Sequence, residues 1–106
     1  MATARSVVFA PEALADLLRL YEIVSEASSP ERAYAYVESL RSHCSGFAEF
    51  PERGTRRDEV RPGLRTVGFR RRVTIAFHIT AETVVIDRLL YGGRDAEALL
   101  REDPDD

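Results

Sequence analysis

Two stretches of the chain place their apolar residues at the three- and four-residue spacing of an amphipathic α-helix. The first follows Pro11, which suits the opening turn of a helix because its missing N–H has no partner there. The second follows a capping serine, Ser29, and a first-turn proline, and it closes at Phe50–Pro51. The apolar stripes are Leu14, Leu17, Leu18, Tyr21 and Val24, and then Ala33, Tyr36, Val37, Leu40, Cys44 and Phe47. We expect an antiparallel helical hairpin.

Elsewhere the apolar residues alternate with polar ones, as in β-strands with one buried face. Val73–Ile79 alternates cleanly, and Thr83–Tyr91 is rich in β-branched residues. The link 80–82 between them is short enough for a β-hairpin. Two shorter runs, Ser6–Ala10 and Val67–Phe69, indicate further strands. Three meandering antiparallel strands are therefore expected, with one face free to receive the helices.

The resulting order is β-α-α-β-β-β, an α+β fold in which a helical hairpin packs on a small, mainly antiparallel sheet. We expect the N-terminal strand to join that sheet. Asp95 can cap a short C-terminal helix through Leu100, and residues 101–106 are expected to form a frayed acidic tail. The whole chain, residues 1–106, is interpreted as one domain. The predicted core includes Leu14, Leu17, Leu18, Val37, Leu40, Cys44, Phe47 and Ile75.

Composition narrows the class of protein. No apolar run approaches the about 20 residues that a membrane-spanning helix needs, and the N-terminus lacks a secretory signal. Cys44 is the single cysteine, so an intrachain disulfide is excluded and a reducing compartment is favoured. We expect a cytoplasmic protein without a membrane segment.

The positive charge is concentrated in the middle of the chain. Residues 53–72 carry eight arginines against Asp58 and Glu59, a formal charge of +6 in a chain whose total is −3. Arginine suits bidentate recognition of carboxylate or phosphate. This connector could be a recognition edge for a protein partner, a phosphate-guiding edge for RNA, or a solvated loop whose acids neutralise part of it.

Few residues are candidates for chemistry. Cys44 lies in the apolar stripe of the second helix, which predicts a buried, inert thiol. Its neighbour His43 points elsewhere on the helix, and no metal-ligand spacing occurs, so neither a metal site nor a cofactor is predicted. His78 lies on the strand face opposite Phe77 and could be an acid or base, or simply a polar surface residue. Arg88 could form a solvated pair with its neighbour Asp87, and Tyr91 ends the last strand.

Four segments in this order resemble the ParE toxins of bacterial type II toxin–antitoxin systems, part of the RelE/ParE superfamily. They are PEALADL opening the first helix, FPERG closing the second, RPGLR leading into the strands, and LLYGGRD ending the last. The resemblance extends from about Val7 to Asp95 and implies the same fold. It implies a toxin that a ParD-like antitoxin neutralises in a hetero-oligomer, with no sequence-specific DNA binding by this chain.

The resemblance leaves two activities open. ParE proteins poison DNA gyrase, whereas RelE relatives cut messenger RNA on the ribosome without a metal. Thr74 stands where those nucleases commonly carry arginine, and Phe77 stands at the family's common tyrosine. Both changes weaken a cleavage site, which needs fixed charges and proton donors. We therefore favour a stoichiometric gyrase poison with no catalytic residue.

The resemblance also indicates which residues bind partners. For the antitoxin or the target we expect contacts from Arg65, Arg70, Arg71, Arg72, Arg88 and Arg94. For the alternative, an mRNA endoribonuclease, the catalytic candidates are His78, Arg88 and Tyr91. His78 occupies a position where the family usually has arginine, and Tyr91 replaces a common histidine. Of the three interpretations of the connector, we favour the partner-recognition edge.

Overall fold

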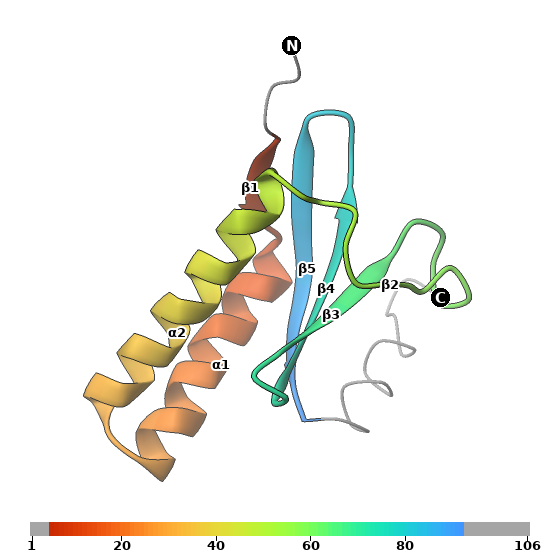
Figure 1. The fold of residues 1–106 in the computed structure, drawn as a ribbon. Helices are drawn as coiled ribbons and strands as arrows, with labels where there is room; N and C mark the ends of the chain where they lie inside the picture. Colours follow the sequence, from red (N-terminus) through yellow and green to blue (C-terminus); the bar gives the residue numbers. More distant parts are fainter. Residues whose placement is uncertain (1–4, 93–106) are drawn as a thin grey trace.

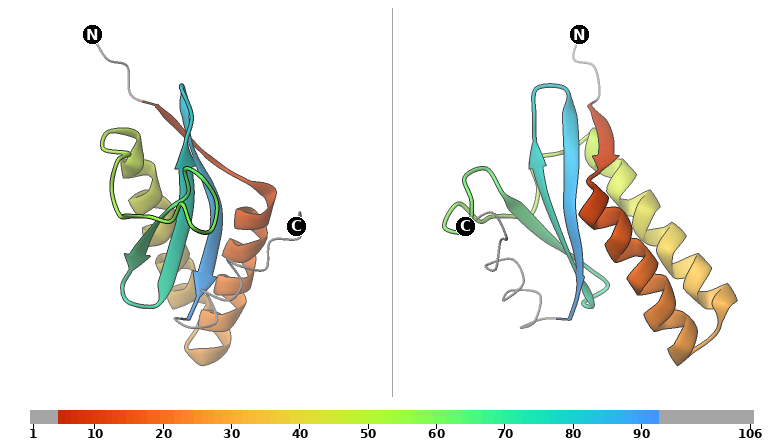
Figure 2. Two further views of the ribbon diagram at one scale, coloured as in Figure 1. Left: turned by 90° about the vertical axis from the view of Figure 1, so that its right-hand side faces the viewer. Right: turned by 180° about the vertical axis from the view of Figure 1, so that it is seen from behind.

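The computed structural model describes residues 5–92, which form two layers, a sheet and a pair of helices (Figure 1). Both helices lie on the same face of the sheet (Figure 2). The elements in chain order are β1 (Ser6–Phe9), α1 (Pro11–Ala27), α2 (Pro30–Ser45), a short 3-10 turn η1 (Gly46–Ala48), β2 (Thr55–Arg56), β3 (Arg65–Phe69), β4 (Val73–Ile79) and β5 (Thr83–Tyr91). The predicted helical hairpin and α+β class are confirmed.

The two helices begin differently, as their sequences indicate. The Ser29 hydroxyl accepts a hydrogen bond from the Arg32 N–H at 3.2 Å, so α2 has a side-chain cap. Ala10 precedes α1 and provides no such bond, although a proline opens both helices. The packing of α1 on β5 and α2, rather than its cap, therefore holds its start in place.

The sheet has five strands in the order β1-β5-β4-β3-β2. β1 pairs with β5 in parallel, and the remaining pairs are antiparallel, so the N-terminal strand joins the sheet as predicted. The β4–β5 register shifts between Ala76 and Phe77, which pair with Arg88 and Ile86. Asp87 is therefore the extra residue of a β-bulge, a device that redirects side chains near it. The two-residue strand β2, within the connector, has no signal in the sequence.

The main core lies between the helices and the sheet. Five of the predicted residues are buried there: Leu17, Leu40, Cys44, Phe47 and Ile75, with Val37 partly buried against them. The prediction was wrong for Leu14 and Leu18, which are 49% and 70% exposed. The buried residues of α1 are instead Ala13, Asp16, Leu17 and Leu20. Because they have the same helical spacing, periodicity alone cannot tell the two stripes apart.

A smaller cluster covers part of the opposite face of the sheet. Leu64, Ala76 and Leu90 are buried there, and Val60 packs against them. The segment between η1 and β3 is therefore not a fully solvated loop, because its apolar residues pack against the sheet. The predicted C-terminal helix and acidic tail, at residues 95–106, lie outside the described residues. No helix within residues 5–92 has the length and apolar character needed to cross a membrane.

Candidate partner-binding site

Most connector arginines are already engaged within the chain. Arg56 pairs with Asp58 at 3.1 Å, and Arg57 pairs with Glu59 at 2.6 Å. Arg61 lies 3.8 Å from the Asp87 carboxylate. These pairs engage three of the eight arginines of residues 53–72, and Asp58 and Glu59 are already counted in the net charge of +6.

Two further connector arginines have structural contacts. The Arg53 guanidinium lies over the Phe47 ring, 4.6 Å from its centroid, and donates to the Phe50 carbonyl at 2.7 Å. Arg65 donates to the Arg53 carbonyl at 3.2 Å. Arg65 was predicted to bind a partner, and the structure shows it tying β3 to the connector.

The turn between β3 and β4 carries three consecutive arginines in an unusual backbone conformation. Arg70 and Arg71 have φ angles of 52° and 60°, and the Arg72 N–H donates to the Phe69 carbonyl at 3.1 Å. Positive φ at both central positions is the pattern of a type I′ turn, which strongly prefers glycine, asparagine or aspartate. Arginine costs about 1 kcal/mol at each such position. No carboxylate among the described residues forms a salt bridge with any of the three.

Two tyrosines complete the surroundings of this turn. The Arg70 guanidinium lies 4.9 Å from the Phe69 ring centroid and 5.7 Å from that of Tyr36. Arg72 donates a long hydrogen bond, 3.4 Å, to the Tyr91 hydroxyl. We call Tyr36, Arg70, Arg72 and Tyr91 the tip cluster. It combines residues from α2, the turn and the end of β5.

The Tyr36 hydroxyl is the unusual polar group of the tip cluster. It is buried and has no hydrogen-bond partner among the described residues. Burial raises the pKa of Tyr36 above its ordinary value; nearby Tyr91 adds to the shift and two arginines oppose it. The hydroxyl therefore stays protonated and can donate a hydrogen bond to an acceptor that reaches it.

A shallow groove borders the tip cluster along α2. It is lined by Ala35, Glu38, Ser39, Ser42, His43, Phe69 and Arg70. The His43 ring packs on Phe69 and Phe47 at 5.2 and 5.6 Å between centroids. Burial, followed by the charge of Arg53, lowers the pKa of His43, so the ring is neutral near pH 7. The positive charge bordering the groove comes from Arg70.

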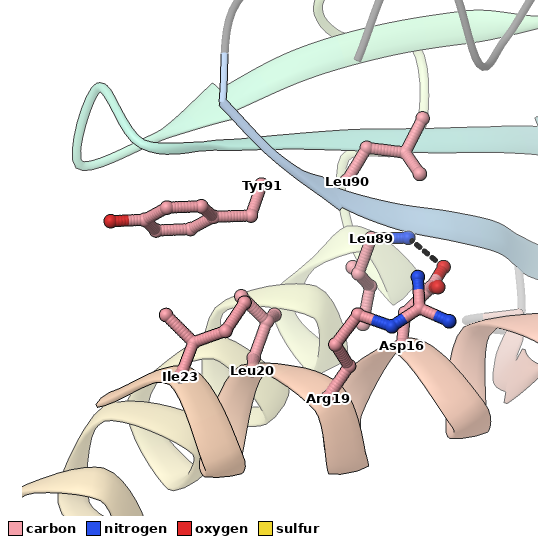
Figure 3. Close-up of a pocket in the computed structure, with 7 residues that line it drawn as sticks. All are labelled: Asp16, Arg19, Leu20, Ile23, Leu89, Leu90 and Tyr91. Carbon is pink, nitrogen blue, oxygen red and sulfur yellow. Dashed lines mark hydrogen bonds between the residues drawn. The ribbon is translucent and has the colours of Figure 1, made fainter. Parts of the chain in front are cut away.

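A small pocket lies on the other side of Tyr91, between α1 and the end of β5 (Figure 3). Its volume is about 130 Å³, and it is lined by Asp16, Arg19, Leu20, Ile23, Leu89, Leu90 and Tyr91. In Figure 3 the Tyr91 ring lies opposite Ile23 and Leu20, so the walls at this end are apolar. The pocket has room for one apolar side chain and lacks a set of polar groups for catalysis.

Asp16, at the inner end of this pocket, binds Arg88. The Arg88 guanidinium donates to both Asp16 oxygens, at 2.8 and 3.1 Å, and the Leu89 N–H donates to the same carboxylate at 2.9 Å. The hydrogen bond to Asp16 raises the pKa of Arg88. The predicted solvated pair between Arg88 and Asp87 was wrong, because the bulge and the approach of α1 give Arg88 a buried partner instead. Arg88 is thus held in a structural ion pair.

His78 and Asp87 form a separate pair on the sheet, with 2.7 Å between Nδ1 and the carboxylate. The structure does not bring the three nuclease candidates together. Tyr91 pairs with Val73 at the start of β4. His78 lies five residues further along β4, so the backbone positions of His78 and Tyr91 are roughly 16 Å apart at the usual strand rise. Arg88 is turned towards Asp16. His78 has a carboxylate partner, and the Arg61 guanidinium lies 3.8 Å from the same Asp87 oxygen, but neither Arg88 nor Tyr91 joins this pair.

Cys44 is fully buried, and burial raises the pKa of its thiol to about 12. The prediction of a core cysteine is confirmed. Within the described residues, no group of three or more histidine, cysteine or acidic side chains is placed to hold a metal ion.

An apolar stripe along α1 faces solvent. Leu14, Leu18 and Tyr21 are 49%, 70% and 36% exposed, and they share one side of the helix because they are four and three residues apart. Exposed apolar surface of this kind marks contact sites for other macromolecules. The residues wrongly predicted to be core thus form a second candidate surface, the α1 stripe.

Residues 7–96 match the family model for the ParE toxin of the type II toxin–antitoxin system parDE. The chain belongs to the ParE family. A solved structure described as the chromosomal ParDE toxin–antitoxin system from P. aeruginosa superposes with a TM-score of 0.75 at 22% identity. That similarity covers 85% of this chain and 98% of the other, and it confirms the fold. The comparison with curated proteins gave no match.

Membership confirms the resemblance that the sequence motifs indicated, and this chain is the ParE toxin of a ParDE system. Of the six predicted contact arginines, Arg70 to Arg72 lie together at the turn, while Arg65 and Arg88 hold the fold. Arg94 lies outside the described residues. From the sequence we predicted neither the role of the Tyr36 hydroxyl as a hydrogen-bond donor nor the burial of Asp16. For Asp16 a signal existed, since it lies three residues from Ala13 and four from Leu20.

Proposed function

We propose that a ParD-like antitoxin holds this ParE toxin inactive in a cytoplasmic hetero-oligomer, and that the free toxin poisons DNA gyrase stoichiometrically. The distance between the nuclease candidates supports the proposal that the toxin acts on gyrase by binding rather than by cutting RNA. Proton transfer and charge stabilisation must act on one phosphodiester at once. The backbone positions of His78 and Tyr91 lie roughly 16 Å apart along the sheet, so the two side chains are poorly placed to act on one phosphodiester, which favours action by binding.

The α1 stripe supports the proposal that a ParD-like antitoxin binds this chain. Its three side chains recur at helical spacing and face solvent, which suits an amphipathic segment laid along α1. Leu18→Asp places a charge at a site 70% exposed, so the fold should tolerate it while the antitoxin contact is lost. Phe50→Asp is the matched control, because Phe50 is 71% exposed and lies outside α1.

Co-expression tests the antitoxin. Growth arrest caused by the toxin should be relieved by the gene encoded beside it, and Leu18→Asp should weaken that relief while Phe50→Asp does not. If the toxin arrests growth and the neighbouring gene never relieves it, the antitoxin assignment is wrong.

Gyrase assays test the target. Purified toxin should inhibit supercoiling or trap cleaved DNA, and the effect should saturate as toxin approaches gyrase in number. Messenger RNA on programmed ribosomes should remain intact.

A second candidate activity rests on the His78–Asp87 pair, since a carboxylate beside a histidine can orient it as a general base. In that case transcripts would be cut, and His78→Ala would slow cutting by roughly 10²-fold or more. Glu22→Ala is a suitable control, because this exposed acid lies on α1 and not on the strands that carry His78 and Asp87. Cleavage with this dependence would replace the gyrase proposal.

A further inference from the structure

We propose that the tip cluster is a carboxylate-binding site that takes an acidic side chain of the antitoxin. This inference rests on the proposed antitoxin partner and specifies where and how its charge is recognised. The ligand class is a single carboxylate on a polypeptide, bound by guanidinium and phenol donors.

The charge balance of the chain points to this turn. The arginines at 56, 57 and 61 pair with carboxylates, and those at 53, 65 and 88 hold the fold. Arg70, Arg71 and Arg72 have no carboxylate partner among the described residues. They therefore form a concentrated positive charge that the described part of the chain can present to another molecule.

The backbone of the turn gives an independent reason. Arg70 and Arg71 both occupy the left-handed region, where asparagine and glycine are favoured. Nothing in the described fold needs a guanidinium at Arg71, and Arg70 only covers two aromatic rings. Backbone strain kept at a site marks it for function when the strained side chains have no structural role.

The hydrogen-bond donors of the tip cluster favour a carboxylate as the ligand. The Arg70 guanidinium lies 4.9 Å from the Phe69 ring centroid and has no hydrogen-bond acceptor or carboxylate partner among the described residues, so two of its N–H groups can bind a carboxylate together. The Arg72 guanidinium has only a long hydrogen bond, 3.4 Å, to the Tyr91 hydroxyl, and its charge and that of Arg70 both act on Tyr36. The unpartnered Tyr36 hydroxyl can donate a further hydrogen bond. An acceptor with two oxygens and a small cross-section satisfies these donors.

A carboxylate fits better than a DNA phosphate for two reasons. The Tyr36 hydroxyl is buried, so an acceptor reaches it only when a neighbour such as the exposed Arg70 side chain moves aside, which a single carboxylate requires to a smaller extent than a duplex backbone. The chain has a net charge of −3 although residues 53–72 contribute +6, so the surface elsewhere is strongly acidic and would repel a long polyanion. A single acid on a peptide avoids that repulsion.

The test measures the dissociation constant between purified toxin and the protein encoded by the adjacent gene, over a range of salt concentrations. Arg70→Asn and Arg72→Gln should each weaken binding at least tenfold, and the salt dependence should become shallower. Tyr36→Phe should weaken binding several-fold without lowering the melting temperature, because it removes an unpaired buried hydroxyl. Arg56→Gln, which also removes one positive charge, is the control and should change binding less than twofold.

The remaining outcomes are distinct. If the tip variants bind the antitoxin as tightly as the wild type, with the same salt dependence, the inference is wrong and the antitoxin proposal stands. If antitoxin binding is kept while gyrase inhibition is lost, the turn contacts the target or its DNA, which also overturns the inference. If the wild-type toxin does not bind the neighbouring protein at all, the proposed partner and this inference both fail.

Discussion

Replacing Asp16 should destabilise the toxin far more than replacing any exposed acid of α1. The Asp16 side chain is 4% exposed and accepts three hydrogen bonds, two from Arg88 and one from the Leu89 N–H. Asp16→Ala leaves that N–H unpaired, which costs about 1–3 kcal/mol, and removes charged hydrogen bonds as well. Arg88 is 28% exposed and regains water, which limits the loss. We expect a destabilisation of about 3 kcal/mol.

Replacing the other member of the ion pair, Arg88, should lower the free energy of unfolding by as much or more, although Arg88 is the more exposed partner. Arg88→Ala leaves a buried carboxylate with one N–H donor, and breaking a buried ion pair in this way costs about 3–5 kcal/mol. The double variant leaves no uncompensated charge, so the two effects should not add. A coupling energy of about 2 kcal/mol or more is expected for groups in one such network.

Urea denaturation followed by circular dichroism provides the measurement, with Glu22→Ala as the control at an exposed site on the same helix. Arg88→Ala protein that remains folded should still bind the antitoxin, because Arg88 faces Asp16. A cost for Asp16→Ala within about 0.5 kcal/mol of the control would refute the reasoning, since that is the range of ordinary surface changes. Strict additivity of the two single variants would refute it as well.

Three other outcomes are expected. Gly54→Ala should lower the free energy of unfolding by several kcal/mol, because the added Cβ would collide with the Thr66 carbonyl and φ is +75°. Gly63→Ala, at a φ of +83° with open space around it, should lower it by only about 1 kcal/mol, and thermal melting measures both. Iodoacetamide should modify Cys44 only as fast as the protein unfolds, and stability should fall above about pH 9, because the folded thiol, with a pKa near 12, keeps a proton that the unfolded one releases. Arg71→Gly should raise the free energy of unfolding by about 1 kcal/mol, and no gain in urea denaturation would mean that the turn is unstrained.

The sequence predicts the strands more reliably than the buried face of the first helix. β4 places its large apolar residues at every second position, and a one-residue slip would move that set to the other face, so its pattern is decisive. In α1 the stripe containing Leu14 and Leu18 is more apolar than the one that the fold buries. The buried stripe includes Ala13 and Asp16, and the partner of Asp16 lies 72 residues away. No local pattern reports a contact at that separation.

The candidate site was only partly predictable for a related reason. A count of arginines identifies the charged segment, but which of them remain unpaired depends on where the acids of the connector come to lie. Asp58 follows Arg56 closely and pairs with it, whereas Arg61 meets Asp87 only through the fold. The backbone angles of Arg70 and Arg71 depend on the length of the β3–β4 turn, which the alternating pattern leaves uncertain by one residue.

The position of β5 between β1 and β4 has a consequence for synthesis of the toxin. β1 and α1 are made before the other described elements, yet their partners at residues 83–89 are among the last described residues to be made. An unfinished chain that stops before residue 83 lacks β5, the strand that pairs with β1 and packs against α1, and its exposed apolar surface favours proteolysis. Translation interrupted within this gene should therefore yield harmless fragments. A cell that carries the toxin gene is exposed to the toxin only after nearly the whole domain has been made.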